Sequence, residues 1–344
     1  MLAIWWNKGV TTVAGLGLCL GLAATAAPVE AAPKTIYAFG DSLTDTGNIT
    51  SSTFGIVPLS PPYAPGRFSN GPLWIDRVAE AYGTQATPSL AGGDNYAFGG
   101  ATTGGAVPPG VTFQTLDFLA RQGTRGADPE ALYIVYGGGN DVRNELTSTL
   151  APEALAAAAT ENVRQAVTNL ALAGAEYIMV PNLSDLALTP ESIAGGPEMM
   201  NRATTLSAAF NTALTGVLAG LEAAYPIDLI PLDVRSLFNS VVGNPAQYGL
   251  TNVDTPCFTG AVDRPGTVCT NPDEYFFWDS VHPTTVAHRI FGDYALAALA
   301  GWDGADGDSG ADPDSDPLQV AEPATLAMLA GGLLGLGLLR RRQA

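Results

Sequence analysis

The sequence places a serine near its beginning and an acid–histidine pair near its end, a combination typical of nucleophilic catalysis. Ser42 stands in a Gly-Asp-Ser-Leu segment directly after an apolar run that ends at Phe39, and Asp279 precedes His282 by three residues. A carboxylate at that spacing can accept a hydrogen bond from the imidazole ring and fix its tautomer. The pattern predicts a triad of Ser42, His282 and Asp279 that attacks a carbonyl carbon.

Only two histidines occur in the chain, so an imidazole base has two candidates. His282 is the better one, because Asp279 precedes it and because Pro283 leads into a helix predicted over 284–300. We expect His282 at a loop-to-helix junction, and we interpret His288, six residues later, as structural. The spacing of the acid and His282 taken alone would also fit a surface turn, and the serine motif decides against that alternative.

Four blocks of sequence resemble those of the GDSL esterases of the SGNH hydrolase superfamily, and they occur in that family's order. They are Phe-Gly-Asp-Ser-Leu-Thr-Asp-Thr-Gly-Asn (39–48), Asn-Tyr-Ala-Phe-Gly-Gly-Ala-Thr (95–102), Gly-Gly-Asn-Asp (138–141) and Asp-Ser-Val-His-Pro (279–283). A further segment, Gly-Arg-Phe-Ser-Asn-Gly-Pro-Leu-Trp (66–74), is similar to the branch of plant GDSL lipases, lecithinase- or hemolysin-like enzymes and autotransporter esterases. The similarity extends over roughly 35–300.

The resemblance implies a role for each block. Ser42 is the expected nucleophile, with His282 as base and Asp279 as acid, and the oxyanion hole would consist of Ser42, Gly100 and Asn140. Acyl transfer needs such donors, because the carbonyl oxygen becomes negative in the tetrahedral intermediate. Gly99 is adjacent to Gly100, and the choice between them depends on spacing. Taken singly, Gly-Gly and Gly-Asn-Asp are ordinary turn signals.

Strand-like and helix-like segments alternate along the chain. Ser42 and Asn140 each follow a predicted strand, and ligands of open α/β sheets bind at the carboxyl edge. We predict an α/β fold: a flavodoxin-like, doubly wound, mainly parallel sheet of about five strands with helices on both faces, an order that the resemblance also implies. No regular structure is predicted for 43–65. The predicted strands cover 35–39, 132–136, 176–180 and 227–232, and the predicted helices 151–173, 198–225 and 284–300.

Composition limits the partners. Among 344 residues, 33 are acidic and 15 are Lys or Arg, which gives a formal net charge of −18. This balance argues against nucleic acid, which needs a basic surface, and against electrostatic docking on anionic lipid. Because the four blocks must meet in space, we predict a single catalytic domain over 27–302. The predicted chemistry requires no metal and no organic cofactor.

The N-terminal segment predicts export. Residues 1–26 combine one lysine, an apolar stretch and a terminal Ala-Thr-Ala, as in a secretory signal peptide, with a membrane anchor as the alternative. Cleavage would leave only Cys257 and Cys269. In an oxidising compartment we expect them to form a disulfide, with two free thiols as the alternative.

The C-terminal segment predicts sorting. Residues 303–319 are rich in Asp and Gly and are interpreted as a flexible linker. Residues 320–344 run from Val-Ala-Glu-Pro through a short apolar, transmembrane stretch to three arginines, and they resemble the PEP-CTERM signal of Gram-negative bacteria. The resemblance implies processing by an exosortase-type enzyme, although Ala321 replaces the first proline, and a permanent tail anchor is the alternative. Both predict transit through the inner membrane to the cell envelope, or secretion after sorting.

These observations predict an exported serine esterase or lipase that cleaves carboxylic esters through an acyl-enzyme. The ester would be a lipid or a small acyl ester. An acyltransferase or phospholipase using the same triad is the nearest alternative. A non-catalytic cell-surface binding protein on this fold is the alternative from another class, and the sorting tail favours it to some extent.

Overall fold

A four-stranded parallel sheet forms the centre of the protein, for which a computed structural model describes residues 35–301. The strand order is β1-β2-β3-β4, and each strand pairs in parallel with the next along the chain. All four predicted strands are present within two residues of their expected ends. They are β1 (Ile36–Gly40), β2 (Leu132–Tyr136), β3 (Tyr177–Pro181) and β4 (Asp228–Leu232).

Residues 94–98 extend the sheet on the outer side of β1. The Tyr96 N–H donates to the Ala38 carbonyl at 2.7 Å, and the Phe98 N–H donates to the Gly40 carbonyl at 3.1 Å. Only one parallel bridge forms there, between Ala38 and Asn95, so this segment is shorter than a regular strand. With it, the sheet has the flavodoxin-like order that the sequence predicts, as four strands and one bridged segment rather than five full strands.

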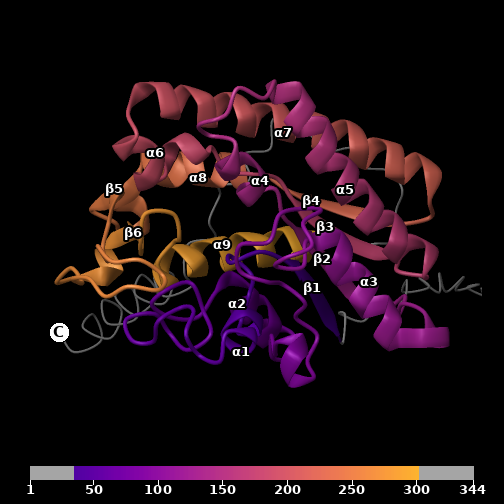
Figure 1. Ribbon diagram of the computed structural model, residues 1–344. Coiled ribbons are helices and arrows are strands. Elements are labelled where there is room, and N and C mark those ends of the chain that lie inside the picture. Colours follow the sequence, from indigo (N-terminus) through magenta and orange to yellow (C-terminus); the bar gives the residue numbers. More distant parts are fainter. Residues whose placement is uncertain (1–34, 302–344) are drawn as a thin grey trace, which may run out of the picture. The chain divides into compact units, whose positions relative to one another are not determined.

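Helices cover both faces of the sheet, as expected for parallel strands that are buried on both sides (Figure 1). β2 is buried at all five positions, which requires a cover on each face. One layer contains α3 (Val111–Gln122), α5 (Pro152–Leu172) and α7 (Pro197–Ala224), which pack against one another. The other contains α2 (Trp74–Ala81), α8 (Val234–Gly243) and α9 (Thr285–Ala300).

Local sequence explains where these helices begin. Pro152 and Pro197 occupy first-turn positions of α5 and α7, where the missing N–H of proline costs nothing. The Thr284 side chain caps α9 by accepting the N–H of Ala287 at 3.3 Å. The predicted helix over 284–300 is therefore present, and His282 lies just before it.

Short elements occupy the connections. The helix α1 lies inside 43–65, where we expected no regular structure, because the Asp45 carboxylate accepts the N–H groups of its first turn. The short α-helices are α1 (Asn48–Ser52), α4 (Gly139–Asn144) and α6 (Pro190–Ala194), and the 3-10 turns are η1 (Ser89–Ala91), η2 (Gly123–Arg125), η3 (Leu186–Leu188), η4 (Pro245–Tyr248) and η5 (Pro272–Glu274).

A second, two-stranded parallel sheet lies before the acid–histidine block and consists of β5 (Asn252–Pro256) and β6 (Tyr275–Phe277). Between its strands, a hairpin at 257–269 is closed by a disulfide between Cys257 and Cys269, whose Cα atoms are 4.9 Å apart. We call this segment the disulfide hairpin. Tyr63, Cys257, Phe258 and Trp278 form a small buried cluster at its base, separate from the main core.

The predicted signal peptide (1–26), linker (303–319) and sorting segment (320–344) lie outside the described residues. Among residues 35–301, no helix has the length and apolar character that crossing a membrane requires. The described residues belong to one compact unit.

Candidate active site

Ser42 lies in a tight turn directly after β1. The Asp41 carbonyl accepts the N–H groups of Thr44 and Asp45, and the Asp41 carboxylate accepts that of Leu43 at 3.0 Å. The Ser42 N–H has no acceptor among the described residues and remains available to a ligand. Gly40 lets the turn approach β2, because a Cβ there would lie 2.5 Å from the Tyr136 carbonyl oxygen.

The structure brings Ser42, His282 and Asp279 into one line of hydrogen bonds, although 240 residues separate Ser42 from His282. The Ser42 Oγ lies 2.9 Å from His282 Nε2, and His282 Nδ1 lies 2.7 Å from Asp279 Oδ2. A carboxylate only accepts, so Nδ1 carries the proton and Nε2 of the neutral ring accepts from the serine hydroxyl. This is the arrangement in which an imidazole can remove the serine proton.

Asp279 is held as a carboxylate by four donors. Its Oδ1 accepts the N–H groups of Val281 at 2.8 Å and His282 at 2.7 Å. Its Oδ2 accepts the Tyr63 hydroxyl at 2.6 Å besides the imidazole. Burial by itself would raise the pKa of Asp279, but the charge of His282 and these hydrogen bonds outweigh it and lower the pKa to about 2.

Asn140 is the second residue of α4, the helix that follows β2. Its Nδ2 donates to the Ala101 carbonyl at 2.9 Å, which uses one amide hydrogen and leaves the second free for a ligand. The neighbouring Asp141 carboxylate accepts both the N–H and the hydroxyl of Thr103, at 2.9 and 2.8 Å. These contacts connect the loop that follows segment 95–102 to segment 138–141 and orient the Asn140 amide.

The buried Asp45 carboxylate distinguishes the two adjacent glycines. Its Oδ2 accepts the Gly99 N–H at 2.8 Å, so that donor is already used. The Gly100 N–H has no acceptor within residues 35–301, and Gly100 adopts a φ of +78°, a conformation that favours glycine. The geometry supports Gly100 rather than Gly99 as the backbone donor of an oxyanion hole.

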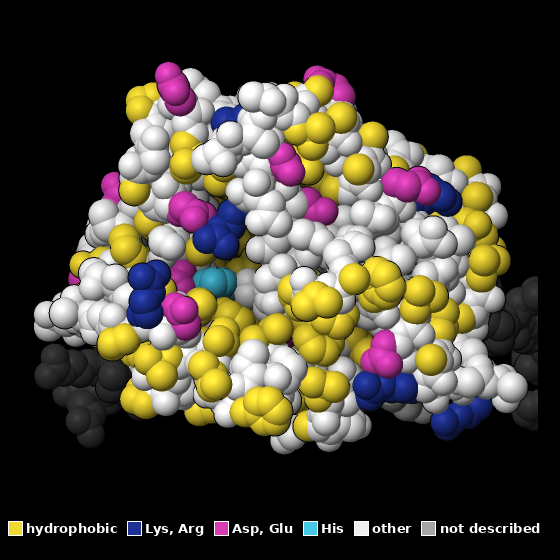
Figure 2. Space-filling model, viewed as in Figure 1, with side chains coloured by type: hydrophobic (Ala, Val, Ile, Leu, Met, Phe, Trp, Pro, Cys, Tyr) yellow, Lys and Arg dark blue, Asp and Glu magenta, His cyan; other side chains and the backbone are white. Residues whose placement is uncertain are grey.

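A cavity of about 100 Å³ opens beside Ser42 and His282. It lies at the carboxyl edge of the sheet, because its walls come from the segments that follow β1, β2, β3 and β4. Figure 2 shows a histidine side chain exposed beside acidic and basic side chains on this face. The apolar part of the wall includes Leu43, Leu183, Leu186, Val234, Phe238 and Phe291.

Two neighbouring features differ from this cavity. Arg143 lines the cavity and forms a bidentate ion pair with Glu191, at 2.6 and 2.8 Å. The Glu191 carboxylate therefore compensates the positive charge of Arg143. A larger hollow of about 990 Å³ lies around Arg67 and Asp76 and includes none of the predicted site residues. Ser42, Asn140 and His282, by contrast, all line the smaller cavity.

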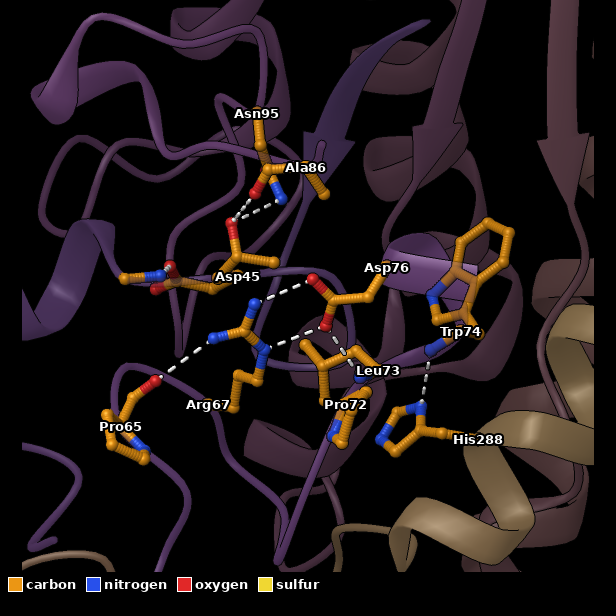
Figure 3. Close-up of polar contacts among 12 residues, drawn as sticks. Asp45, Pro65, Arg67, Pro72, Leu73, Trp74, Asp76, Ala86, Asn95 and His288 are labelled. Atoms are coloured by element: carbon orange, nitrogen blue, oxygen red, sulfur yellow. Dashed lines mark hydrogen bonds and ion pairs between the residues drawn. The ribbon is translucent and has the colours of Figure 1, made fainter. Parts of the chain in front are cut away.

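His288 and Arg67 of the segment 66–74 form polar contacts with neighbouring parts of the chain (Figure 3). His288 is buried, its Nδ1 accepts the Trp74 N–H at 3.4 Å, and burial lowers its pKa to about 3. A neutral, buried ring without contact to Ser42 agrees with the structural interpretation. Arg67 binds Asp76 through two hydrogen bonds of 2.7 and 2.6 Å and also donates to the Pro65 carbonyl at 3.1 Å.

Between residues 35 and 301, no group of three or more His, Cys, Asp or Glu side chains is arranged to hold a metal ion. The polar groups around Ser42 are an imidazole bonded to a buried carboxylate and the Asn140 amide, which are kinds of group that acyl transfer requires.

The family follows from comparison with known proteins. A sequence profile of the family described as GDSL-like Lipase/Acylhydrolase matches residues 36–295. The chain belongs to this family.

Several relatives resemble this GDSL-family protein. An uncharacterized protein in the trpE-trpG intergenic region of Pseudomonas putida is 33% identical over 313 residues, covering 82% of this chain and 51% of the relative. Esterase EstA of Pseudomonas aeruginosa is 32% identical over 342 residues, covering 82% and 49%. The phosphatidylcholine-sterol acyltransferase of Aeromonas hydrophila is 27% identical over 335 residues, covering 83% and 95%. The chain thus spans about half the length of the first two relatives.

Among solved structures, a putative GDSL-like lipase from Parabacteroides merdae aligns with 79% of this chain and 98% of its own, at 14% identity and a TM-score of 0.45.

Two aromatic residues beside the triad of this GDSL-family protein were not predicted. Tyr63 donates to Asp279, and the Phe68 ring lies 5.2 Å from the His282 ring, tilted by 34°. Phe68 belongs to the segment singled out by resemblance, whereas Tyr63 lies in the stretch interpreted as a loop. No spacing rule connects Tyr63 with an acid 216 residues away.

Proposed function

We propose that this protein is a serine esterase that hydrolyses carboxylic esters through an acyl-enzyme. The observation that carries the proposal is the line of hydrogen bonds from the Ser42 Oγ through His282 to Asp279, at 2.9 and 2.7 Å. The Ser42 end of this line faces a cavity of about 100 Å³, which Asn140 also lines.

In the first half-reaction, His282 Nε2 takes the hydroxyl proton while the Ser42 Oγ attacks the ester carbonyl carbon. The developing oxyanion receives hydrogen bonds from the N–H groups of Ser42 and Gly100 and from the Asn140 amide. His282 then gives its proton to the leaving alcohol oxygen, and the acyl group remains on Ser42.

In the second half-reaction, water occupies the place of the alcohol. His282 takes one water proton as the oxygen attacks the acyl carbon, the same donors stabilise the second oxyanion, and Ser42 leaves with the proton. Asp279 stays ionised throughout and stabilises the imidazolium, in agreement with its lowered pKa.

The apolar walls of the cavity favour an aliphatic acyl chain over an acetyl group. A smaller cavity of about 20 Å³ shares Val234, Phe238 and Phe291 with the first and continues it between α8 and α9. Burial of each methylene stabilises a bound chain by about 0.8 kcal/mol. We expect the Phe238→Ala variant, with its larger cavity, to move the preferred acyl length upward, which a series of esters of graded length would measure.

Acyl transfer to an alcohol or cleavage of a phospholipid is the second candidate, since the same triad would perform it. This candidate is supported by the relative named phosphatidylcholine-sterol acyltransferase, 95% of whose length is matched. Adding acceptor alcohols to the hydrolysis assay separates the two reactions, because transfer produces a new ester at the expense of free acid.

We also propose export, followed by sorting through an exosortase-type enzyme that recognises 320–344. The disulfide between Cys257 and Cys269 supports an oxidising compartment. Mass spectrometry of the protein from envelope and medium fractions would identify its first and last residues and so test whether the N-terminal segment and residues 320–344 are removed.

The esterase is tested with the full chain and p-nitrophenyl esters of graded acyl length, with the Ser42→Ala variant alongside. Ser184→Ala is the matched control, because Ser184 lines the same cavity but makes no contact with His282. We expect wild type and Ser184→Ala to hydrolyse esters and to react with a fluorophosphonate, and Ser42→Ala to do neither. A folded wild type that neither hydrolyses an ester nor reacts with the probe would favour the alternative that this protein is a non-catalytic binding protein.

A further inference from the structure

The acid of the triad has a second side-chain partner besides the histidine. The Tyr63 hydroxyl donates to Asp279 Oδ2 at 2.6 Å, and Oδ2 also accepts from His282 Nδ1. Tyr63 and Asp279 are 1% and 3% exposed, so water does not compete for this contact. Tyr63 is absent from the walls of the cavity beside Ser42 and therefore does not touch a substrate there.

We propose that Tyr63 is a positioning residue that holds Asp279 Oδ2 in place and limits how strongly this oxygen attracts the His282 proton. This inference rests on the proposed function only for its effect on turnover. The effect on His282 itself does not require that the protein hydrolyse an ester.

The first argument is saturation of the carboxylate. A carboxylate offers about four acceptor positions, and Asp279 uses four, two on each oxygen. With all positions filled, the group cannot rotate about its last bond without losing a donor. Without Tyr63, Oδ2 would retain only His282 as a donor, and the share of negative charge on this oxygen would act on the imidazole alone.

The second argument is direction of donation. Burial and the adjacent charge of Asp279 raise the pKa of Tyr63 far above its usual value, so the phenol remains protonated and donates. Part of the carboxylate charge is thereby neutralised by a donor that does not titrate. Tyr63 accordingly makes the His282 imidazolium less stable than Asp279 alone would make it.

The third argument is what holds Tyr63. The Phe258 ring packs edge-on against Tyr63 at 5.5 Å, and Phe258 stacks on Trp278 at 5.6 Å, directly before Asp279. The Leu59 N–H donates to the Val262 carbonyl at 2.7 Å, which attaches the chain before Tyr63 to the disulfide hairpin. The disulfide hairpin thus supports the Tyr63 ring from outside the catalytic cavity.

Other charged groups face the same atoms. Asp41 and His288 interact electrostatically with His282, Arg143 interacts with Asp279, and Asp263 interacts with Tyr63. All remain in the Tyr63→Phe variant, which removes one oxygen. A difference between this variant and wild type therefore reports the hydroxyl.

The test is an NMR titration of the histidine ring signals in the full chain without a histidine tag. The chain has only two histidines, and burial lowers the pKa of His288 to about 3, so the His288 ring stays neutral during the titration and does not obscure the His282 signal. In Tyr63→Phe we expect His282 to become protonated at a pH higher by roughly half a unit or more, because its partner oxygen has lost a competing donor. Tyr133→Phe is the matched control, since that buried hydroxyl donates to the Asp128 carbonyl, and it should leave the titration unchanged.

Kinetics give the second readout. The acidic limb of the kcat/KM profile of Tyr63→Phe should move in the same direction as the NMR midpoint, and kcat should fall about tenfold with KM nearly constant. Loss of packing alone would lower stability without moving that limb. If Tyr63→Phe does not fold, wild type with its disulfide reduced provides the second perturbation, and a shift to higher pH is expected there.

An unchanged His282 titration in folded Tyr63→Phe, or a shift to lower pH, would overturn the inference. The same holds for an unchanged titration in folded, reduced wild type when the variant does not fold. Failure of the proposed function looks different: wild type would not hydrolyse esters, while the NMR titration would still decide the role of Tyr63.

Discussion

Replacing Asn140 by alanine tests the oxyanion hole. The Asn140 amide has two N–H donors, and the one that donates to the Ala101 carbonyl at 2.9 Å holds the other in a fixed direction. Such a donor is oriented before the reaction begins and acts only when the oxyanion forms. The substitution should therefore change kcat rather than KM.

The expected magnitude follows from two separate effects. Losing one oxyanion donor costs about 2.7–4 kcal/mol of transition-state stabilisation, or roughly 10²–10³ in kcat. The buried Ala101 carbonyl also loses its partner, which should lower the free energy of unfolding by about 1–3 kcal/mol. Asn140→Asp should lose at least as much activity, because a carboxylate cannot donate and repels the oxyanion.

The assay is steady-state hydrolysis of a p-nitrophenyl ester, with active sites counted by fluorophosphonate labelling and stability measured by urea unfolding. Asn162→Ala is the matched control: the Asn162 Nδ2 donates to the Thr103 hydroxyl at 3.1 Å, so it binds the same loop without facing the cavity. We expect the control to stay within about threefold of wild-type kcat.

Two outcomes would contradict this reasoning. A kcat for Asn140→Ala within about fivefold of wild type would show that the amide does not stabilise the transition state. An equal loss in Asn162→Ala would show that attachment of the loop, rather than donation by Asn140, accounts for the effect.

Three further predictions concern pH, the disulfide and a glycine. Burial raises the pKa of Asp41 from 3.8 to about 6, so the folded state binds an extra proton between these values, and stability should fall as the pH rises from about 4 to about 6. In Asp41→Asn, melting temperatures measured across this range should lose that decline, and an unchanged slope would exclude Asp41 as its source. Removing the disulfide with Cys257→Ser and Cys269→Ser should lower the free energy of unfolding by about 3 kcal/mol, given the separation of 12 residues, and urea unfolding with and without reductant measures it. Equal stability of the oxidised wild type and the double variant would refute that estimate. Gly99→Ala should lower kcat, because a Cβ would overlap the Phe68 ring beside His282, whereas Gly216→Ala, whose Cβ meets open space, should not, and equal rates would contradict this.

Much of this protein could be predicted from local sequence. Apolar runs of five residues separated by helix-length segments predict parallel strands, because this alternation is a property of neighbouring residues, and all four strands are present. The positions of Ser42 and Asn140 at strand ends follow from the same pattern. His282 and Asp279 are close in sequence, so one turn suffices to bring them together.

Other features depend on packing between distant segments. The structure shows α1 where we expected a loop, because Asp45 is buried and accepts its first N–H groups. The same carboxylate uses the Gly99 N–H and thereby supports Gly100, a choice that spacing left open. The fifth position of the sheet is filled by residues 94–98, for which no strand was predicted, through a single bridge between Ala38 and Asn95.

The sequence by itself determined which residues can do chemistry and on which elements they lie, since residue type and local periodicity carry that information. Only the tertiary structure decided what surrounds them. The contact between Tyr63 and Asp279 spans 216 residues, and the cavity wall is assembled from the ends of four strands. Such contacts arise when buried polar groups must find partners in a close-packed interior, a requirement that no short stretch of sequence records.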